Sequence, residues 1–168
     1  MADKYIELNG GALQEKEAIT SSAGAGDTGK IPALDGAGRL DSSMMPVGIG
    51  ADTATIEASE TLAAGDMVNI HDATGRRVRK ADASNGREVH GFVLSAVTSG
   101  QNGTVYFEGT ITGLSGLTIG AKYFLSASTA GEIVATAPSG SGELVQRAGT
   151  AISATELSFE PADPITLA

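Results

Sequence analysis

The stretch from Leu62 to Val97, "LAAGDMVNIHDATGRRVRKADASNGREVHGFVLSAV", decides the expected fold. Its short runs, such as "DMVNIH" and "RRVRKA", follow a period of two and are rich in β-branched side chains. Thr74-Gly75 and Asn85-Gly86 separate these runs, and such pairs are typical of tight turns between antiparallel strands. The stretch therefore predicts β-hairpins.

The same pattern begins at Thr53 and continues toward the end of the chain. Further strands are expected in "TATIEA", "GTVYFEGTIT", "AKYFLSA", "EIVATA", "ELVQRAGTAIS" and "ELSFEP", with turns at Asn102-Gly103, Ala130-Gly131 and Ser139 to Gly142. No segment with a helical period exceeds about two turns. We therefore expect residues 51–168 to form an all-β body, a small antiparallel β-barrel or sandwich.

Two halves of this expected body, about residues 62–108 and 117–160, resemble each other. Both end in a Phe-Glu pair. The shared frame includes Leu62/Leu117, Gly65/Gly120, Ile70/Leu125, Thr74/Thr129, Gly75/Gly131, Val78/Val134 and Gly91/Gly149. Chance similarity between glycine-rich hairpins is the alternative, and the sequence leaves both open. A real repeat would pack two similar sheet-forming units into one body.

Residues 1–50 have a different composition, rich in Gly, Ala, Ser and Asp with isolated apolar residues. "KIPALDGAGRLD" predicts two short extended pieces around a turn at Gly36 to Gly38, and Leu13 to Ile19 could form at most one or two helical turns. We expect an extended, Gly/Ala-rich N-terminal arm that cannot bury its own apolar side chains. These side chains would contact a partner surface or pack back on the body: they are Ile31, Leu34, Leu40, Met44 and Met45.

The composition excludes several classes of function. The net charge is −9, which argues against nucleic-acid binding because that function normally needs a basic surface. The chain has no Cys, so it has no disulfide and no Cys-based zinc site. No run of about 18 apolar residues occurs, so the sequence predicts no membrane span. With four Phe, three Tyr and no Trp, the core should be modest and could gain stability from an oligomer or a partner.

The stretch "GAGDTGKI", Gly24 to Ile31, matches the G-x-x-x-x-G-K part of a nucleotide-binding P-loop. A P-loop follows a buried strand and leads into a helix whose N-terminus faces the phosphates. Here the polar "EAITSSA" precedes the loop, Ile31 stands where Ser or Thr would hold magnesium, and Pro32 follows. We expect a flexible turn instead of a nucleotide site.

His71 and His90 are the two histidines, and no metal-ligand spacing or nucleophile joins them in the sequence. A surface or sheet-edge position is expected for both. The acidic residues are scattered singly, and no G-x-S-x-G nucleophile elbow occurs. We therefore expect that the chain is not an enzyme and that it has no catalytic residue, no cofactor and no metal site.

Basic residues are concentrated in one segment of this acidic chain. Five of the eleven fall within twelve positions: Arg76, Arg77, Arg79, Lys80 and Arg87. One interpretation places them on an edge strand, where charge discourages unwanted pairing. The other makes Arg76, Arg77, Arg79 and Lys80 a contact patch for an acidic neighbour, such as another copy of the chain.

Three stretches carry a resemblance to a known family. "TLAAGDMVNIHDATGRRVRKADASNGREVHGFVLSAVTSGQNGTVYFEGTI" resembles the capsid decoration proteins (cement or head-stabilising proteins) of tailed bacteriophages. "GLTIGAKYFLSASTAGEIVATAPSGSGELVQRAGTAIS" is similar to a module of phage head and tail appendage proteins, and "GDTGKIPALDGAGRLDSSMMP" to connector stretches in such proteins. The three stretches cover most of the chain.

The resemblance implies a small β-barrel or sandwich, often a homotrimer, bound to the major capsid protein on the outside of a phage shell. Such a protein is made in the cytoplasm of the host bacterium, has no active site, and bridges neighbouring capsomers against the pressure of packaged DNA. A tail-fibre, spike or head-fibre component is the first alternative. A carbohydrate-binding β module is another, although the low aromatic content is unfavourable for it.

Overall fold

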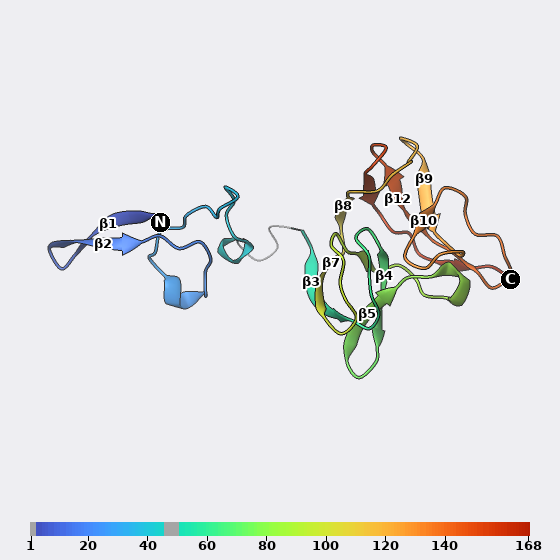
Figure 1. Cartoon of the computed structure of the whole chain (residues 1–168), viewed down its shortest axis with the longest axis horizontal. Helices are drawn as coiled ribbons and strands as arrows, with labels where there is room; N and C mark the ends of the chain where they lie inside the picture. The colour runs from blue at the N-terminus through green and yellow to red at the C-terminus, as the bar shows by residue number, and fades with distance from the viewer. Residues whose placement is uncertain (1–2, 46–50) are drawn as a thin grey trace. The chain divides into compact units, whose positions relative to one another are not determined.

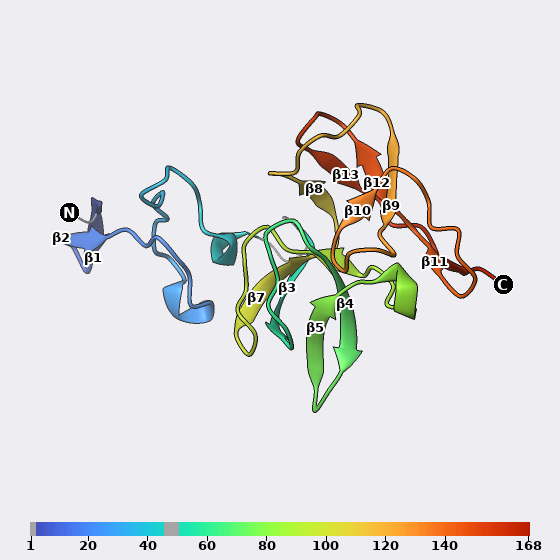
Figure 2. The same cartoon turned by 45° about the vertical axis from the view of Figure 1, so that its right-hand side comes forward.

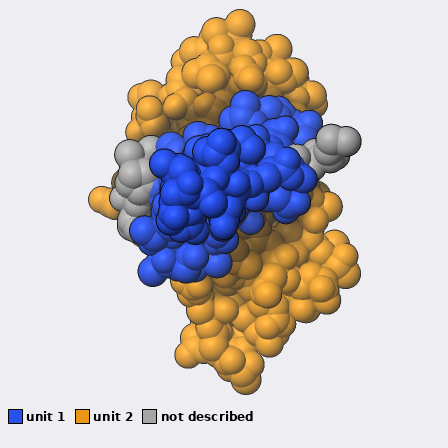
Figure 3. Space-filling model, turned by 90° about the vertical axis from the view of Figure 1, so that its left-hand side faces the viewer, with its two compact units in different colours: residues 1–50 blue, residues 51–168 orange. Residues whose placement is uncertain are grey.

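The computed structural model describes residues 3–45 and 51–168. Contacts between residues divide the chain into a unit of residues 1–50 and a unit of residues 51–168 (Figure 3). The division falls at the boundary that the change of composition predicts between arm and body. Strands and short 3-10 turns make up the regular structure of the described residues, so the fold class is all-β, as expected.

The first unit contains a β-hairpin of β1 (Lys4–Asn9) and β2 (Ala12–Glu17) (Figure 1). Gly10 and Gly11, both with positive φ, form its two-residue turn. The expectation of helical turns at residues 13–19 is wrong. Folding back at the two glycines pairs Leu13 with Leu8 and puts acidic and basic side chains opposite each other, which favours a strand.

The rest of the first unit is irregular. The 3-10 turn η1 (Ala25–Asp27) is followed by a short parallel bridge between Ile19 and Pro32. Gly38 has positive φ at the expected turn of residues 36–38, and the turn is fixed by the Asp35 carboxylate, which accepts hydrogen bonds from two backbone N–H groups. A second 3-10 turn, η2 (Ser42–Met44), ends the described part of the unit.

The second unit begins with a closed five-stranded barrel, visible in Figures 1 and 2. Its strands run in the order β3-β5-β4-β6-β7, and β3 pairs with both β5 and β7 to close it. The strands are β3 (Thr53–Ala58), β4 (Met67–Asp72), β5 (Arg76–Lys80), β6 (Gly91–Phe92) and β7 (Asn102–Tyr106). The predicted Thr74-Gly75 turn joins β4 to β5, and both turn residues have positive φ. Small apolar side chains, mainly valines, fill the interior.

An open five-stranded antiparallel sheet follows in the order β10-β9-β12-β13-β8. It is built from β8 (Gly109–Ile111), β9 (Lys122–Leu125), β10 (Ile133–Val134), β12 (Arg147–Ala151) and β13 (Leu157–Phe159). In Figure 2 this sheet lies above the barrel strands. A two-stranded sheet of β11 (Leu144–Val145) and β14 (Ile165–Thr166) and the 3-10 turn η3 (Ala83–Asn85) complete the unit.

The barrel and the open sheet have the same strand order and register. Pairing of Met67 with Phe92 in the barrel corresponds to pairing of Lys122 with Thr150 in the sheet. The Gly65 N–H donates to the Val93 carbonyl at 2.8 Å, and the Gly120 N–H donates to the Ala151 carbonyl at the same distance. These equivalences agree with the shared sequence frame at Gly65/Gly120 and Gly91/Gly149.

Two pairs of that frame are wrong by one residue. Ile70 pairs with Val78 in the barrel, and Leu125 pairs with Ile133 in the sheet, so Val78 corresponds to Ile133 and not to Val134. The pair Gly75/Gly131 is displaced in the same way. The sequence comparison aligned the two glycines, whereas the ladder fixes the register by the apolar side chains that face the core.

The two halves share a core that holds them together. Phe92 of β6 packs against Tyr106 with the ring centroids 5.4 Å apart and against Phe159 of β13 at 5.1 Å. Met67, Leu125 and Leu157 belong to the same buried cluster. Contacts of this kind are expected to make the halves one cooperative unit.

One further expectation in this unit is wrong. Asn102-Gly103 does not form a turn but begins β7, and the chain instead turns at Gly100, which has positive φ. Gly103 is required for packing, because a Cβ there would lie 2.5 Å from a methyl carbon of Val97. The stretch "EVHGFVLSAV" also contains β-branched side chains, but only Gly91–Phe92 forms a strand there.

Candidate functional site

The P-loop-like stretch forms a small closed turn. The Lys30 Nζ pairs with the Asp27 Oδ1 at 2.6 Å, and the Asp27 carboxylate also accepts a hydrogen bond from the Ala23 N–H. The hydrogen bond from Lys30 lowers the pKa of Asp27, and the same bond raises the pKa of Lys30. The residues after Lys30 are extended and bridge to Ile19 at Pro32, so this lysine does not lead into a helix. The ion pair and the hydrogen bond to Asp27 therefore hold this turn closed.

His71 forms a contact that the sequence did not indicate. Its Nε2 lies 2.9 Å from the Oγ of Ser59, which follows β3. The Ser59 Oγ also donates to the Val78 carbonyl at 3.1 Å, so His71 is best placed to donate to this hydroxyl instead of accepting its proton. Burial first, and then the nearby Arg79, lower the pKa of His71, which favours the neutral ring.

To act as a nucleophile, Ser59 would need His71 as a base, with a carboxylate or carbonyl that orients the ring. It would also need hydrogen-bond donors that stabilise an oxyanion. No carboxylate contacts the His71 ring nitrogens in the part of the chain that the structure describes. His90 is bonded separately: its Nδ1 accepts from the Ile70 N–H at 2.9 Å, and its Nε2 lies 3.1 Å from Glu88. Both histidines therefore support the barrel wall.

The basic strand β5 is not an edge strand, contrary to one of the two interpretations. It pairs with β4 on one side and β3 on the other, because the barrel closes there. Arg77 pairs with Glu57 at 3.1 Å, the Arg79 Nε donates to Asn69, and Lys80 pairs with Asp66 at 3.2 Å. Three of the four proposed contact residues thus bond within the barrel, and Arg76 is left exposed.

The proposed contact residues of the first unit have a different environment. Large parts of Ile31, Leu34, Leu40 and Met45 are exposed to solvent, with exposed fractions of 40% to 55%, and Met44 is half-buried. Each lies in an irregular segment or at the end of a 3-10 turn. The structure thus leaves their apolar surface available to a partner.

The hairpin adds an apolar face that sequence reasoning missed. Leu8 and Leu13 face each other across β1 and β2, and Ile6 lies two residues along on the same face. Their exposed fractions are 63% for Ile6, 68% for Leu8 and 75% for Leu13. The alternation in "KYIELN" was the available signal, but charged residues in "QEKE" favoured the helical interpretation. We call Ile6, Leu8 and Leu13 the hairpin face.

Aromatic side chains do not form a platform on the surface. All seven are buried or half-buried, including Phe92, Tyr106 and Tyr123 in the shared core. Sugar-binding modules stack their ligands on exposed aromatic rings. This arrangement is unfavourable for a carbohydrate-binding module.

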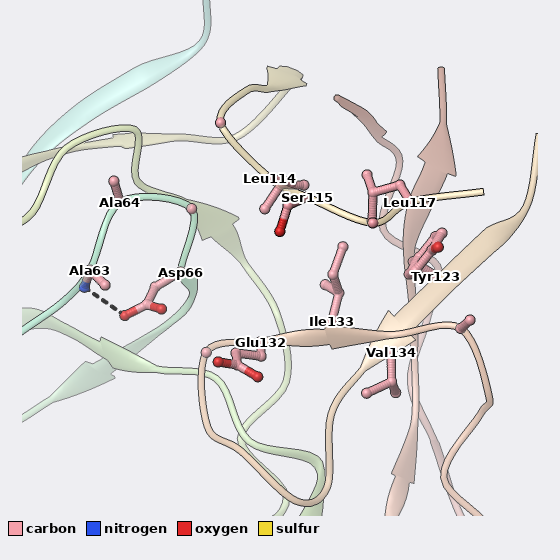
Figure 4. A pocket seen from close by; sticks show the side chains of 15 residues that line it. Ala63, Ala64, Asp66, Leu114, Ser115, Leu117, Tyr123, Glu132, Ile133 and Val134 are labelled. Carbon is pink, nitrogen blue, oxygen red and sulfur yellow. Dashed lines mark hydrogen bonds between the residues drawn. The ribbon is translucent and has the colours of Figure 1, made fainter. Parts of the chain in front are cut away.

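A cavity of about 430 Å³ lies in the second unit, between β10 and the segment that follows β8 (Figure 4). Leu114, Leu117, Tyr123 and Ile133 line it with apolar surface, and Asp66 lies at one end. Among residues 3–45 and 51–168 no group of three or more His, Asp or Glu side chains is arranged to hold a metal ion.

No protein-family model matches the chain, and no curated protein matches its sequence. Within the described ranges no helix is both long enough and apolar enough to cross a membrane.

Proposed function

We propose that this chain is a structural virion protein that binds the outer surface of a phage capsid as an oligomer and bridges neighbouring capsomers. The observation that carries the proposal is a contrast between the two units. The second unit has a complete core of its own, whereas the first keeps most of its large apolar side chains exposed. A segment of this kind gains stability when it docks on another surface.

The hairpin face illustrates the need for a partner. An isolated two-stranded hairpin is at best marginally stable in water. Burying an aliphatic side chain of this size completely contributes about 1.5–3 kcal/mol, so the mostly exposed Ile6, Leu8 and Leu13 could together contribute several kcal/mol on docking. A trimer would present three such faces, and multivalent attachment raises the overall affinity well above that of one arm.

Two groups that could suggest catalysis make other contacts in the described residues. Lys30 is paired with Asp27, and the Ser59–His71 contact has no orienting carboxylate there. The resemblance to decoration proteins supplies the partner, the major capsid protein, and the likeness of the connector stretch to other phage appendages agrees with it.

The test is binding to purified, expanded shells of the parent phage, measured by co-sedimentation and by the melting temperature of the shell. The wild-type chain should bind in hundreds of copies per shell and raise the melting temperature. A Leu34→Asp, Leu40→Asp double variant should bind at least about tenfold more weakly, because each change places a charge in an apolar contact.

The matched control is an Ile119→Asp, Ile152→Asp double variant, which changes two apolar residues of the second unit that are at least about as exposed as Leu34 and Leu40. It should bind like the wild type. If wild-type protein does not bind shells, or if the two double variants bind equally, the proposal fails. A copy number of only a few to tens per particle would favour a fibre or spike component instead.

A further inference from the structure

The open sheet of the second unit has a seam where the barrel is closed. In the barrel, the six-residue β3 continues past its pairing with β7 and forms a parallel pair with β5. Its counterpart β8 has only three residues, and Gly113 and Gly116 follow with positive φ. The strand therefore ends before it can reach β10, and the edge of β10 stays open beside residues 112–117.

The backbone of Ile133 has unused hydrogen-bonding groups at this seam. In the barrel, the carbonyl of the equivalent Val78 accepts from the Ser59 N–H at 2.8 Å. Directly before β10, the Glu132 carbonyl accepts a hydrogen bond from the Ser126 N–H, so the alternation of an antiparallel ladder turns the Ile133 N–H and C=O outward. Neither group has a partner among the described residues.

The cavity beside this edge has the size of a ligand pocket, and apolar side chains form part of its lining. At about 430 Å³ it falls within the usual range for such pockets. Figure 4 shows the Ile133 side chain pointing from β10 toward the segment that carries Leu114 and Leu117. An exposed strand edge next to apolar pockets is the arrangement that proteins use to bind an extended peptide as an additional strand.

The charge at the seam indicates which side chain an added strand would carry there. In the barrel, Glu57 of β3 lies opposite Arg77 of β5, and their side chains pair at 3.1 Å. The residue equivalent to Arg77 is Glu132, which directly precedes β10, is exposed and has no ion pair within the described ranges. The opposite sign at this position favours a basic side chain on the incoming strand.

We propose that the seam binds an extended segment of another protein chain, added parallel to β10. This segment carries Lys or Arg opposite Glu132 and a small or apolar residue opposite Ile133, where the barrel has Ala58 opposite Val78. The inference does not depend on binding to a phage shell.

A second copy of this chain fits the seam less well. Three of the four basic residues in its first unit already pair with acids of that unit: Lys4 with Glu15, Lys16 with Glu7 and Lys30 with Asp27. The net charge of −9 also opposes the approach of two copies. The occupant is therefore assigned to a different polypeptide.

Two octapeptides test the proposal against the full chain. One has the sequence of residues 53–60, "TATIEASE", which contains β3, and the other carries Glu57→Lys. Binding is measured by NMR amide shifts and by hydrogen exchange of the Ile133 N–H. The lysine peptide should slow exchange at Ile133 and bind about fivefold or more tightly than the glutamate peptide, with a preference that weakens in high salt.

A Glu132→Arg variant provides the decisive control. It restores the charge that the barrel has at Arg77 and should reverse the preference in favour of the glutamate peptide. The proposal is overturned if neither peptide protects the Ile133 N–H at millimolar concentration, or if Glu132→Arg leaves the preference unchanged. Shifts of the same amides on concentrating the protein without peptide would identify a second copy as the occupant and would also overturn it.

Discussion

Gln146 connects the two halves of the second unit through three hydrogen bonds. Its Oε1 accepts from the Val89 N–H at 2.6 Å, and its Nε2 donates to the carbonyls of Val89 and Ala162 at 3.2 and 3.1 Å. Gln146 and Val89 are both 3% exposed. Replacing Gln146 with Met keeps the approximate size of the side chain and removes all three bonds.

The expected loss of stability follows from these groups. A buried N–H left without a partner costs about 1–3 kcal/mol, and each lost carbonyl bond about 0.5–1.5 kcal/mol. The gain from burying the apolar end of Met offsets part of this, roughly 1 kcal/mol. We expect Gln146→Met to lower the free energy of unfolding by about 1–5 kcal/mol.

Urea unfolding followed by circular dichroism measures this change. With a slope of about 2 kcal/mol per molar urea, the midpoint should fall by about 0.5–2.5 M. Gln101→Met is the matched control, because the Gln101 side chain is exposed and makes no hydrogen bond in the described residues. A midpoint within about 0.25 M of wild type for Gln146→Met, at unchanged slope, would show that this amide does not hold the halves together.

Three further predictions concern the same unit. Gly149→Ala should lower the free energy of unfolding by at least about 1–3 kcal/mol, because its Cβ would lie 2.0 Å from the Ser158 carbonyl oxygen. As a control, Gly36→Ala should change thermal melting little, because a Cβ at Gly36 would meet no atom within 4 Å. Ile56→Ala in the barrel core should cost about 2–5 kcal/mol, and Ile119→Ala, 70% exposed, under about 0.5 kcal/mol in the same urea assay. The pKa of His71 should lie below 6.5 when it is measured by NMR. Because the folded pKa is lowered, the stability of the protein should fall as the pH drops from 6.5 toward that pKa, and His71→Gln should lack this fall. An NMR midpoint at or above 6.5 would contradict the burial argument.

Local chemistry made the barrel hairpins predictable. The strands of "DMVNIH" and "RRVRKA" and their Thr74-Gly75 turn depend on residues close together in the sequence, and the structure has them where the pattern puts them. The boundary between the two units follows a change of composition near residue 50 for the same reason. Signals of this range are present in the chain itself.

Contacts between distant residues explain what the sequence did not reveal. Alternating charges in "ALQEKE" suit a helix equally well, and only the partner strand β1 decides for a hairpin. Closure of the barrel joins β3 to β5 across more than fifteen residues, which removes the edge that Arg77 and Arg79 were expected to protect. The Ser59–His71 contact is a product of the same closure, since Ser59 directly follows β3.

Comparison of the two halves separates what the fold requires from what it does not. Gly91 and Gly149 are equivalent, and at both positions a Cβ would meet the backbone of the next strand, at 2.6 and 2.0 Å. The fold therefore requires glycine there. A closed form of the same strand order exists in the barrel, so packing alone does not require the other half to stay open.

An open strand edge carries a risk, because it can pair with any extended chain. The edge at β10 is short and lies next to Glu132, so it resists indiscriminate pairing. It nevertheless presents the Ile133 N–H and C=O beside a cavity that is lined in part by Leu114 and Leu117. A strand edge that is short and charged, but can still pair with one added strand, is suited to selective binding. The difference between the two halves therefore indicates the seam, and not the barrel, as the binding site.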